Sequence, residues 1–229
     1  MPDRSDEDGL RVRYFGWIFV RLGVLLYRLR TRISRDTLPE FGNKPKNLNI
    51  DLPRNISGPE RLFFGNDVDI GPGSFLIAVR RYPSKKFSSP AFPMEPQTFE
   101  PTLRIGDRVT ATANLQLFVQ ANITIGDDVM LASNVFMNDG SHGYATANTP
   151  YKYQPIFKIA PITVERGCWI GQNVVIMPGV TIGEYAVIGA NSVVTRSIPP
   201  KCIATGSPAR VLKRWDDEHE RWVASDGER

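Results

Sequence analysis

The chain has 229 residues, of which 41% are hydrophobic and 23% charged, so its composition is that of a globular protein and excludes an intrinsically disordered chain. Lysine and arginine outnumber the acidic residues by 28 to 24, and the excess falls in residues 1–35, which hold eight arginines and four acids. We therefore expect no nucleic-acid binding, because a nucleic-acid binder carries its basic charge as a patch on the folded body.

The supply of cysteine and histidine limits the chemistry further. Two cysteines, Cys168 and Cys202, make no disulfide framework, which is typical of a reducing compartment, and we expect a cytoplasmic protein. A zinc site needs three or four protein ligands at characteristic spacing, and the only histidines are His142 and His219. We therefore expect no metal site.

Residues 10–34 have the spacing of an amphipathic helix that follows an irregular acidic tail. Their apolar side chains recur at intervals of three and four: Phe15, Ile18, Phe19, Leu22, Leu25, Leu26 and Leu29. Arg21 interrupts the longest apolar stretch, so the segment is too short and too charged to span a bilayer. A signal peptide is not expected because the leading residues are acidic. Two interpretations stay open: peripheral contact with a membrane through residues 10–34, or docking on the protein itself or on a neighbouring subunit.

A six-residue period dominates the rest of the chain. Aliphatic residues stand six positions apart at Ile170, Ile176, Ile182, Ile188 and Val194. The same spacing recurs at Ile125, Leu131 and Met137, at Ile105, Ala111 and Leu117, and at Phe64, Ile70 and Leu76. Neither the period of a helix nor that of a plain strand produces this pattern, but short strands joined by tight corners do. Three such units complete one coil of a solenoid, so we expect Ile170 to stack on Ile188 and Ile176 on Val194.

The period defines the domain organisation. Residues 81–101, with five prolines, and residues 143–161, with three tyrosines, interrupt it, and such excursions from a rigid scaffold commonly carry function. About five coils remain: 62–80, 102–121, 122–141, 162–179 and 180–197. We expect a tail and helix over 1–35, a connecting segment over 36–61, the repeat domain over 62–204, and a C-terminal segment with a short helix over 205–229.

Three runs near the C-terminus resemble a known family. They are Trp169-Ile-Gly-Gln-Asn-Val-Val-Ile-Met-Pro-Gly-Val-Thr-Ile-Gly183, Val187-Ile-Gly-Ala-Asn-Ser-Val-Val-Thr195 and Gly206-Ser-Pro-Ala-Arg-Val-Leu-Lys213. They resemble hexapeptide-repeat acetyltransferases of the maltose and galactoside type, and within these the O-acetyltransferases of bacterial surface polysaccharides such as O-antigen. The resemblance implies an all-β fold, the left-handed parallel β-helix, and a homotrimer that binds acetyl-CoA between two subunits. It implies O-acetylation of a sugar or lipid-linked saccharide in polysaccharide or lipopolysaccharide biosynthesis, at the cytoplasmic face of the inner membrane if the helix binds lipid.

The chemistry requires a base. Transfer of an acetyl group from a thioester to a hydroxyl needs the hydroxyl proton removed, and a neutral imidazole suits that task. His142 follows the third coil in the run Asn138-Asp-Gly-Ser-His-Gly-Tyr144, which resembles the Asp-His-x-His-Gly motif of the polysaccharide subgroup. Asp139 and His142 match this motif, while Gly140 replaces its first histidine. The resemblance therefore assigns the base to His142, and a structural loop histidine is the alternative.

The candidate residues for binding the acceptor each have a functional and a structural interpretation. The resemblance places an acceptor-contacting Asn one to two coils before the base, where this chain has Thr112 and, two residues later, Asn114. Asn114 is the candidate, and a corner residue is the alternative. Asp139 either orients His142, binds a sugar hydroxyl or caps a turn, and Tyr144 either stacks on a sugar or packs within its loop.

On the donor side the resemblance carries over to six residues: Gln172, Ala190, Thr195, Arg196, Arg210 and Lys213. It places Ala190 and Gln172 against the pantetheine arm of CoA. It places Arg210 and Lys213 near the phosphates, where positive charge is required. The alternative for these residues is a solvated surface. Cys168 falls at a small-residue position of the repeat, which favours a packed thiol over a nucleophile.

Three other functions are known for chains with such a repeat. N-acetylation of an amino-sugar nucleotide is the enzymatic alternative, but enzymes of that kind commonly carry an N-terminal β-α-β region that this sequence lacks. A non-catalytic β-helix scaffold is the other alternative, against which His142, Arg210 and Lys213 argue. A γ-type carbonic anhydrase needs three histidines for its zinc, and two are present. His219 is expected to be a solvated residue of the C-terminal helix.

Overall fold

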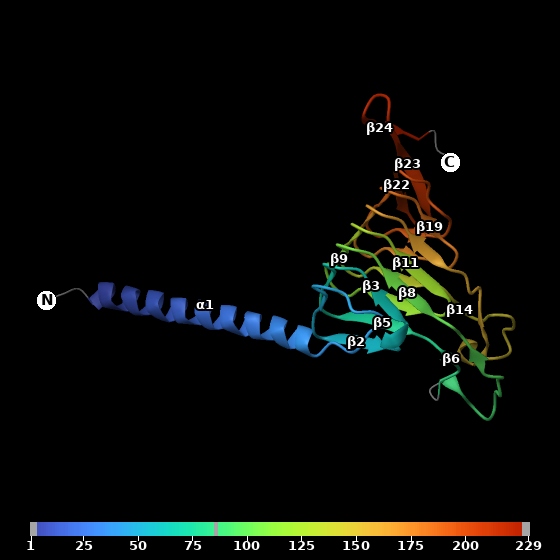
Figure 1. Cartoon of the computed structure of the whole chain (residues 1–229), viewed down its shortest axis with the longest axis horizontal. Coiled ribbons are helices and arrows are strands. Elements are labelled where there is room, and N and C mark those ends of the chain that lie inside the picture. Colours follow the sequence, from blue (N-terminus) through green and yellow to red (C-terminus); the bar gives the residue numbers. More distant parts are fainter. Residues whose placement is uncertain (1–3, 85–86, 226–229) are drawn as a thin grey trace. The chain divides into compact units, whose positions relative to one another are not determined.

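The computed structural model of the chain describes residues 4–84 and 87–225, which form two compact units that divide after Leu38 (Figure 1). The first unit is helix α1, Arg4–Asp36. The second unit, which begins at Pro39, contains the strands.

Helix α1 begins earlier than expected. The sequence predicts it from Leu10, whereas the helix starts at Arg4, and residues 1–3 of the expected tail lie outside the described part of the chain. The helix ends before Pro39, and the Thr37 hydroxyl donates to the carbonyl of Ile33 at 2.7 Å. None of the described helices has the length and apolarity needed to cross a membrane.

The second unit is a parallel β-helix, as the repeat predicts (Figure 1). Its strands stack in three sheets, which we call faces A, B and C, and the chain enters them in that order. Face A stacks β1 (Asn49–Ile50), β4 (Asp69–Ile70), β9 (Thr110–Ala111), β12 (Met130–Leu131), β17 (Trp169–Ile170), β20 (Val187–Ile188) and β22 (Cys202–Gly206). Face B stacks β2 (Arg54–Ser57), β5 (Ser74–Ala78), β10 (Gln116–Val119), β13 (Phe136–Asn138), β18 (Val175–Ile176) and β21 (Val193–Val194). Face C stacks β3 (Leu62–Phe64), β8 (Thr102–Ile105), β11 (Asn122–Ile125), β16 (Ile162–Val164) and β19 (Thr181–Ile182).

The predicted stacking of the core is confirmed. Ile170 pairs in register with Ile188, and Ile176 pairs with Val194. The aliphatic residues of the six-residue series are all buried between the faces. In the middle of the β-helix Leu117 pairs with Met137, so the coil there takes 20 residues instead of 18 and keeps the same inward-facing set.

The segment 36–61 is more than a connection. Strands β1 and β2 lie within it and pair in parallel with β4 and β5, which adds a partial coil below the first predicted one. Ile50 pairs with Ile70 and Ile56 with Leu76, so the core begins here. The 3-10 helix η1 (Pro59–Arg61) then leads into face C.

The expected C-terminal helix is wrong. Residues 205–225 contain β23 (Ala209–Asp216), antiparallel to β22, and β24 (Arg221–Ala224), which returns along β23. Trp215 and Trp222 face each other across this hairpin, with ring centroids 5.4 Å apart. This cross-strand aromatic contact outweighs the helical preference of the charged run between them. His219 therefore lies in the hairpin turn, where its Nδ1 is 2.8 Å from Asp216 Oδ2.

Two excursions leave the β-helix at the same corner. The first, residues 79–101, follows β5 and contains the antiparallel pair β6 (Arg81–Tyr82) and β7 (Gln97–Thr98). The second, residues 139–161, follows β13 and contains the antiparallel pair β14 (Ser141–His142) and β15 (Ile156–Phe157), with the 3-10 helix η3 (Tyr151–Tyr153) between them. Both run from face B to face C, and β6 and β14 lie on the same side of the β-helix in Figure 1.

Candidate active site

His142 lies at the corner where the second excursion leaves the β-helix. Its backbone is held in β14, opposite Ile156 of β15, and its side chain is exposed. The preceding residues, Asp139 and Gly140, are buried. The imidazole is thus carried outward by a short hairpin that is anchored on a closely packed turn.

Two aromatic residues of the first excursion hold the His142 ring. The Tyr82 ring, 5% exposed, meets the imidazole edge-on, with centroids 5.4 Å apart, and Tyr82 Oη lies 3.2 Å from His142 Nδ1. The Phe87 ring centroid is 5.8 Å from that of His142. The Tyr82 hydroxyl also donates to the carbonyl of Lys152 at 2.5 Å. Neither Tyr82 nor Phe87 was expected from the sequence, although the phase of the repeat could have indicated that both excursions leave from one corner.

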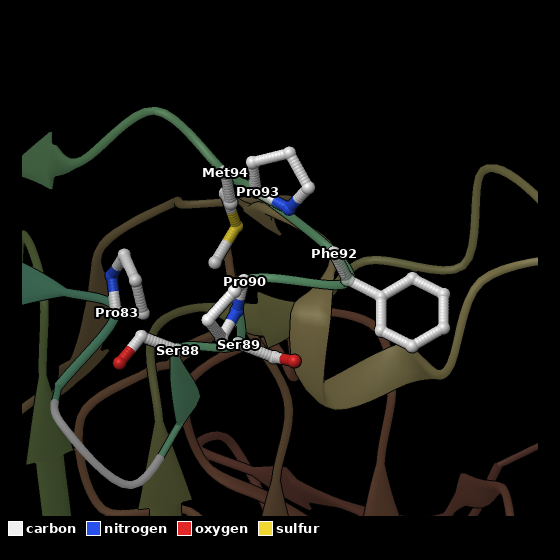
Figure 2. Close-up of a pocket in the computed structure, with 7 residues that line it drawn as sticks. All are labelled: Pro83, Ser88, Ser89, Pro90, Phe92, Pro93 and Met94. Carbon is white, nitrogen blue, oxygen red and sulfur yellow. The ribbon is translucent and has the colours of Figure 1, made fainter.

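A pocket lies within the first excursion, beside these residues. Its volume is about 320 Å³. It is lined by Pro83, Ser88, Ser89, Pro90, Phe92, Pro93 and Met94 (Figure 2). In Figure 2 the Met94 side chain points toward Ser88 and Pro90, whereas Phe92 points away from them. The Phe92 ring stacks on Tyr153 of the second excursion at a centroid distance of 5.2 Å, which joins the pocket to the loop that carries His142.

Asp139 caps a turn, one of the alternatives open for it. Its Oδ1 accepts from the backbone N–H of Gln120 at 2.6 Å, and its Oδ2 accepts from that of Ala121 at 2.9 Å. Burial raises the pKa of the Asp139 carboxyl, and the backbone hydrogen bonds oppose that shift. The carboxylate thus stabilises the corner of the neighbouring coil, from which the His142 hairpin starts.

Tyr144 packs within its own loop. Its ring meets that of Phe157 edge-on at 4.6 Å, and 62% of the residue is exposed. Tyr144 therefore lies on the same excursion as His142, two residues after the end of β14, and its side chain is open to solvent.

Asn114 belongs to a ladder of asparagines at the corner between faces A and B. Each side-chain amide donates to the next at 2.9 Å, in the order Asn114, Asn134, Asn173 and Asn191. All four have positive φ, between 53° and 62°, a conformation that asparagine tolerates better than most residues. The ladder agrees with the structural alternative for Asn114.

The donor-side candidates fall at two corners and on one strand. Gln172 and Ala190 are exposed at the asparagine-ladder corner, on successive coils. Thr195 and Arg196 are exposed at the His142 corner, after β21. Arg210 and Lys213 are exposed on β23. The candidates with positive charge therefore all reach solvent.

Within one chain the structure does not bring the two corners together. The ladder corner and the His142 corner lie at opposite ends of the face B strands. From Val135 to Asn138 the chain runs through face B for four residues, or about 13 Å. Asn114, Gln172 and Ala190 are thus separated from His142 by the width of face B. Among the described residues, no three His, Cys, Asp or Glu side chains gather closely enough to hold a metal ion.

Comparison with known proteins shows which proteins this chain is similar to. The sequence profile described as bacterial transferase hexapeptide (six repeats) matches residues 161–196. Galactoside O-acetyltransferase of Escherichia coli K12 is 38% identical over 124 residues, 54% of this chain and 60% of that protein. WbbJ of the same organism, named for O-acetyl transfer in lipopolysaccharide biosynthesis, is 35% identical over 107 residues, 44% of this chain and 55% of that protein.

A solved structure agrees with the fold. AntD, an N-acyltransferase from Bacillus cereus, superposes with a TM-score of 0.61 at 20% identity over 78% of this chain and 86% of its own. The chain spans only about three fifths of the length of the curated relatives it matches. Its repeat and its stacked faces agree with these likenesses: residues 161–196 carry the hexapeptide repeat of bacterial transferases, and the chain is similar to acetyltransferases built on that repeat.

Proposed function

We propose that this chain transfers an acetyl group from acetyl-CoA to a sugar hydroxyl during synthesis of a cell-surface polysaccharide. The observation that carries the proposal is the setting of His142, whose backbone is fixed in a hairpin, whose ring packs on Tyr82, and whose side chain reaches solvent. The names of two relatives, galactoside O-acetyltransferase and WbbJ, support O-acetyl transfer, and that of WbbJ supports an acceptor of the lipopolysaccharide class.

The chain's residues suit each part of this reaction. His142 takes the proton of the acceptor hydroxyl while the oxygen attacks the acetyl carbonyl, and the proton then passes to the departing CoA thiolate. Acetyl-CoA supplies the activated acyl group as a thioester. The exposed cations Arg196, Arg210 and Lys213 fit its phosphates, and the small side chain of Ala190 leaves the corner backbone open to its pantetheine arm.

Binding of the donor can be tested without knowledge of the acceptor. We expect calorimetric titration with acetyl-CoA and with CoA to give one site per chain for wild type and for His142→Ala. Turnover of an acceptor should fall by about 10²–10⁴-fold in His142→Ala. His219→Ala, at the exposed hairpin turn, should keep full turnover. Absence of binding by the folded protein, or normal turnover by His142→Ala, would contradict the proposal.

A panel of acceptors tests whether the chain acetylates a hydroxyl or an amine. Saccharides with free hydroxyls, including lipid-linked ones, are compared with amino-sugar nucleotides as acceptors of radiolabelled acetyl groups. We expect labelled ester, which mild base removes. A base-stable amide as the main product would instead assign the chain to N-acetylation.

We also propose that the working form is a homotrimer in which one copy supplies the His142 corner and its neighbour the ladder corner. The separation of Gln172 and Ala190 from His142 by the width of face B supports this arrangement. Light scattering should give three times the chain mass. Mixtures of His142→Ala and Ala190→Trp, refolded together, should regain part of the turnover that each lacks alone. If the mixture stays inactive while both variants form trimers, the shared site is excluded.

For helix α1 we propose contact with the anionic cytoplasmic face of a membrane. Its described exposed side chains include a large apolar set: Trp17, Phe19, Val20, Leu22, Val24, Leu25, Leu26, Leu29 and Ile33. Arg21, Arg28, Arg30, Arg32 and Arg35 accompany them. Apolar and cationic side chains on one helix suit the interface of an anionic bilayer.

Vesicle flotation tests the membrane contact with the full chain. Wild type should float with anionic vesicles and much less with zwitterionic ones, and Leu22→Glu/Leu26→Glu should stay unbound. If wild type stays unbound, and the Glu variant instead changes the oligomeric mass, then α1 binds other copies of the chain and the membrane proposal fails.

A further inference from the structure

We infer that Tyr82 is a positioning residue that fixes the tautomer of His142, so that Nε2 is the nitrogen that carries the lone pair. The two residues come from different excursions, β6 and β14, and meet through Tyr82 Oη and His142 Nδ1 at 3.2 Å. The catalytic consequence rests on the proposed function, whereas the tautomer itself does not.

The assignment follows from counting protons. A phenol has one proton, and a carbonyl oxygen can only accept. Because the Tyr82 hydroxyl donates to the carbonyl of Lys152, its proton is committed there, and its oxygen faces His142 Nδ1 as an acceptor. Nδ1 must then carry the hydrogen that donates to Tyr82 Oη. A neutral imidazole has one N–H, so Nε2 is unprotonated and carries a lone pair.

The state of Tyr82 supports this count. The side chain is 5% exposed, and burial raises the pKa of its hydroxyl above the ordinary tyrosine value. The phenol therefore keeps its proton at the pH of the cytoplasm and continues to donate to Lys152. Its ring also contacts Phe87 at a centroid distance of 5.7 Å, and Phe87 contacts His142 in turn, so the three rings form one cluster.

The position of the unprotonated Nε2 suits a general base. Nδ1 faces the buried hydroxyl of Tyr82, so the opposite ring nitrogen is directed away from this contact, on an exposed side chain. A hydroxyl acceptor that arrives from solvent thus meets a lone pair rather than an N–H. Without Tyr82, the ring is free to place its proton on Nε2, where it would block proton uptake.

Nitrogen NMR on ¹⁵N-histidine protein reads the tautomer directly. The chain has two histidines, so His219→Asn leaves a single imidazole to observe. Spectra are recorded at about pH 9, where a free imidazole is neutral. We expect the lone-pair resonance on Nε2 and the N–H resonance on Nδ1. In Tyr82→Phe, which keeps the ring and removes only the hydroxyl, the Nε2–H form should become predominant.

The same variants give an independent kinetic readout. Loss of a partner that orients a metal-ligating histidine commonly costs about 10–100-fold in activity, and for the analogous contact here we expect a loss of that order in kcat of Tyr82→Phe with little change in KM. The matched control is Tyr151→Phe, an exposed tyrosine on the 3-10 helix that contains Lys152, which should keep both tautomer and kcat.

The outcomes separate this inference from the proposed function. A wild-type spectrum with the proton on Nε2, or an unchanged spectrum in folded Tyr82→Phe, overturns the inference. If Tyr82→Phe does not fold, the wild-type spectrum alone still decides. Should the tautomer be as expected while no acetyl transfer is found, the role of Tyr82 stands and the proposed function fails.

Discussion

The side-chain amide of Gln97 makes both hydrogen bonds that a strand would offer to the backbone of Ile156. Gln97 Oε1 accepts from Ile156 N at 2.7 Å, and Gln97 Nε2 donates to Ile156 O at 3.0 Å. Gln97 is the cross-strand partner of Tyr82, and Ile156 is that of His142. These two strand pairs therefore meet through both of their cross-strand partners, Gln97 with Ile156 and Tyr82 with His142, in addition to the contacts of Tyr82 with Lys152 and of Phe92 with Tyr153.

Gln97→Leu should loosen this junction without unfolding the β-helix. It leaves the N–H and C=O of Ile156 without their partner, a cost of about 1–3 kcal/mol for each group that stays buried. Because the excursions lie outside the stacked core, we expect a small change in Tm. Turnover should fall several-fold, because the His142 ring is no longer held at a fixed position.

Hydrogen exchange distinguishes local loosening from global loss. In Gln97→Leu the amides of His142 and Ile156 should exchange faster, while those of Ile123 and Leu131, in the core of the coils, keep the wild-type rate. Equal acceleration at all four amides would show that Gln97 supports the whole fold rather than the junction.

The stacked coils could be predicted because one period specifies them. Each inward residue repeats at a fixed spacing, so Ile170 on Ile188 follows from counting. The first partial coil was missed although Ile50 and Ile56 stand six residues apart. The 3-10 helix η1 adds residues before Phe64, and this insertion shifts the phase and conceals the earlier pair.

The candidate site was predicted only in part, for a physical reason. His142 and the turn at Asp139 lie where the repeat ends, so local sequence indicates them. The contact between Tyr82 and His142 joins residues 60 positions apart on excursions that have no period. Their pairing depends on β6 and β14 projecting from the same corner and meeting across the one coil that separates their excursions. Side-chain packing decides this meeting, and spacing does not.

The asparagine ladder yields a prediction about stability. Asn134 has φ of 62° and both donates and accepts a ladder hydrogen bond. Asn134→Gly keeps the conformation at little strain and loses the two bonds, so we expect a loss of about 1–2 kcal/mol in the free energy of unfolding. Asn134→Ala adds about 1 kcal/mol of backbone strain to that loss.

Urea titration of the two Asn134 variants separates these contributions. The midpoint should fall in the order wild type, Asn134→Gly, Asn134→Ala, with similar slopes. Equal midpoints for wild type and Asn134→Gly would mean that the ladder bonds add nothing. A lower midpoint for glycine than for alanine would contradict the strain argument.

Replacing Gly71 or Gly23 by alanine should change stability in opposite directions. A Cβ on Gly71 would lie 1.8 Å from the carbonyl oxygen of Thr112 in the next coil, so the backbone must move, and Gly71→Ala should destabilise the β-helix strongly. Around Gly23, in α1, nothing lies within 4 Å of the added Cβ. Gly23→Ala should therefore raise the stability of the helix by about 1 kcal/mol.

Circular dichroism checks this pair. The β signal of Gly71→Ala should melt at a markedly lower temperature than that of wild type. For Gly23→Ala the helical signal should melt later while the β transition is unchanged. A lower helical melting temperature in Gly23→Ala would show that Gly23 is in contact with another molecule, for which a side chain leaves no room.

The two thiols should be inert in the folded protein. Cys168 and Cys202 are each 1% exposed, and Cys168 Sγ donates to the carbonyl of Gly183 at 3.1 Å. Burial, with a smaller contribution from the Glu165 carboxylate, raises the pKa of Cys168 to about 11. At pH 8 Ellman's reagent should therefore find no fast thiol in the native chain and two after unfolding in urea, and a fast native thiol would contradict the packed-thiol interpretation.

The raised pKa of Cys168 also predicts a pH dependence of stability. The unfolded thiol ionises near 9.0 and the folded one near 11, so the folded state binds more protons between these values. The contribution of the thiol is complete below pH 9 and is lost as the pH rises toward 11, by about 3 kcal/mol at most. Because Cys168→Ala lacks this titration, the difference in urea midpoint between wild type and Cys168→Ala should shrink over that range. A difference that stays constant from pH 8 to about pH 11 would mean that the thiol ionises equally in both states.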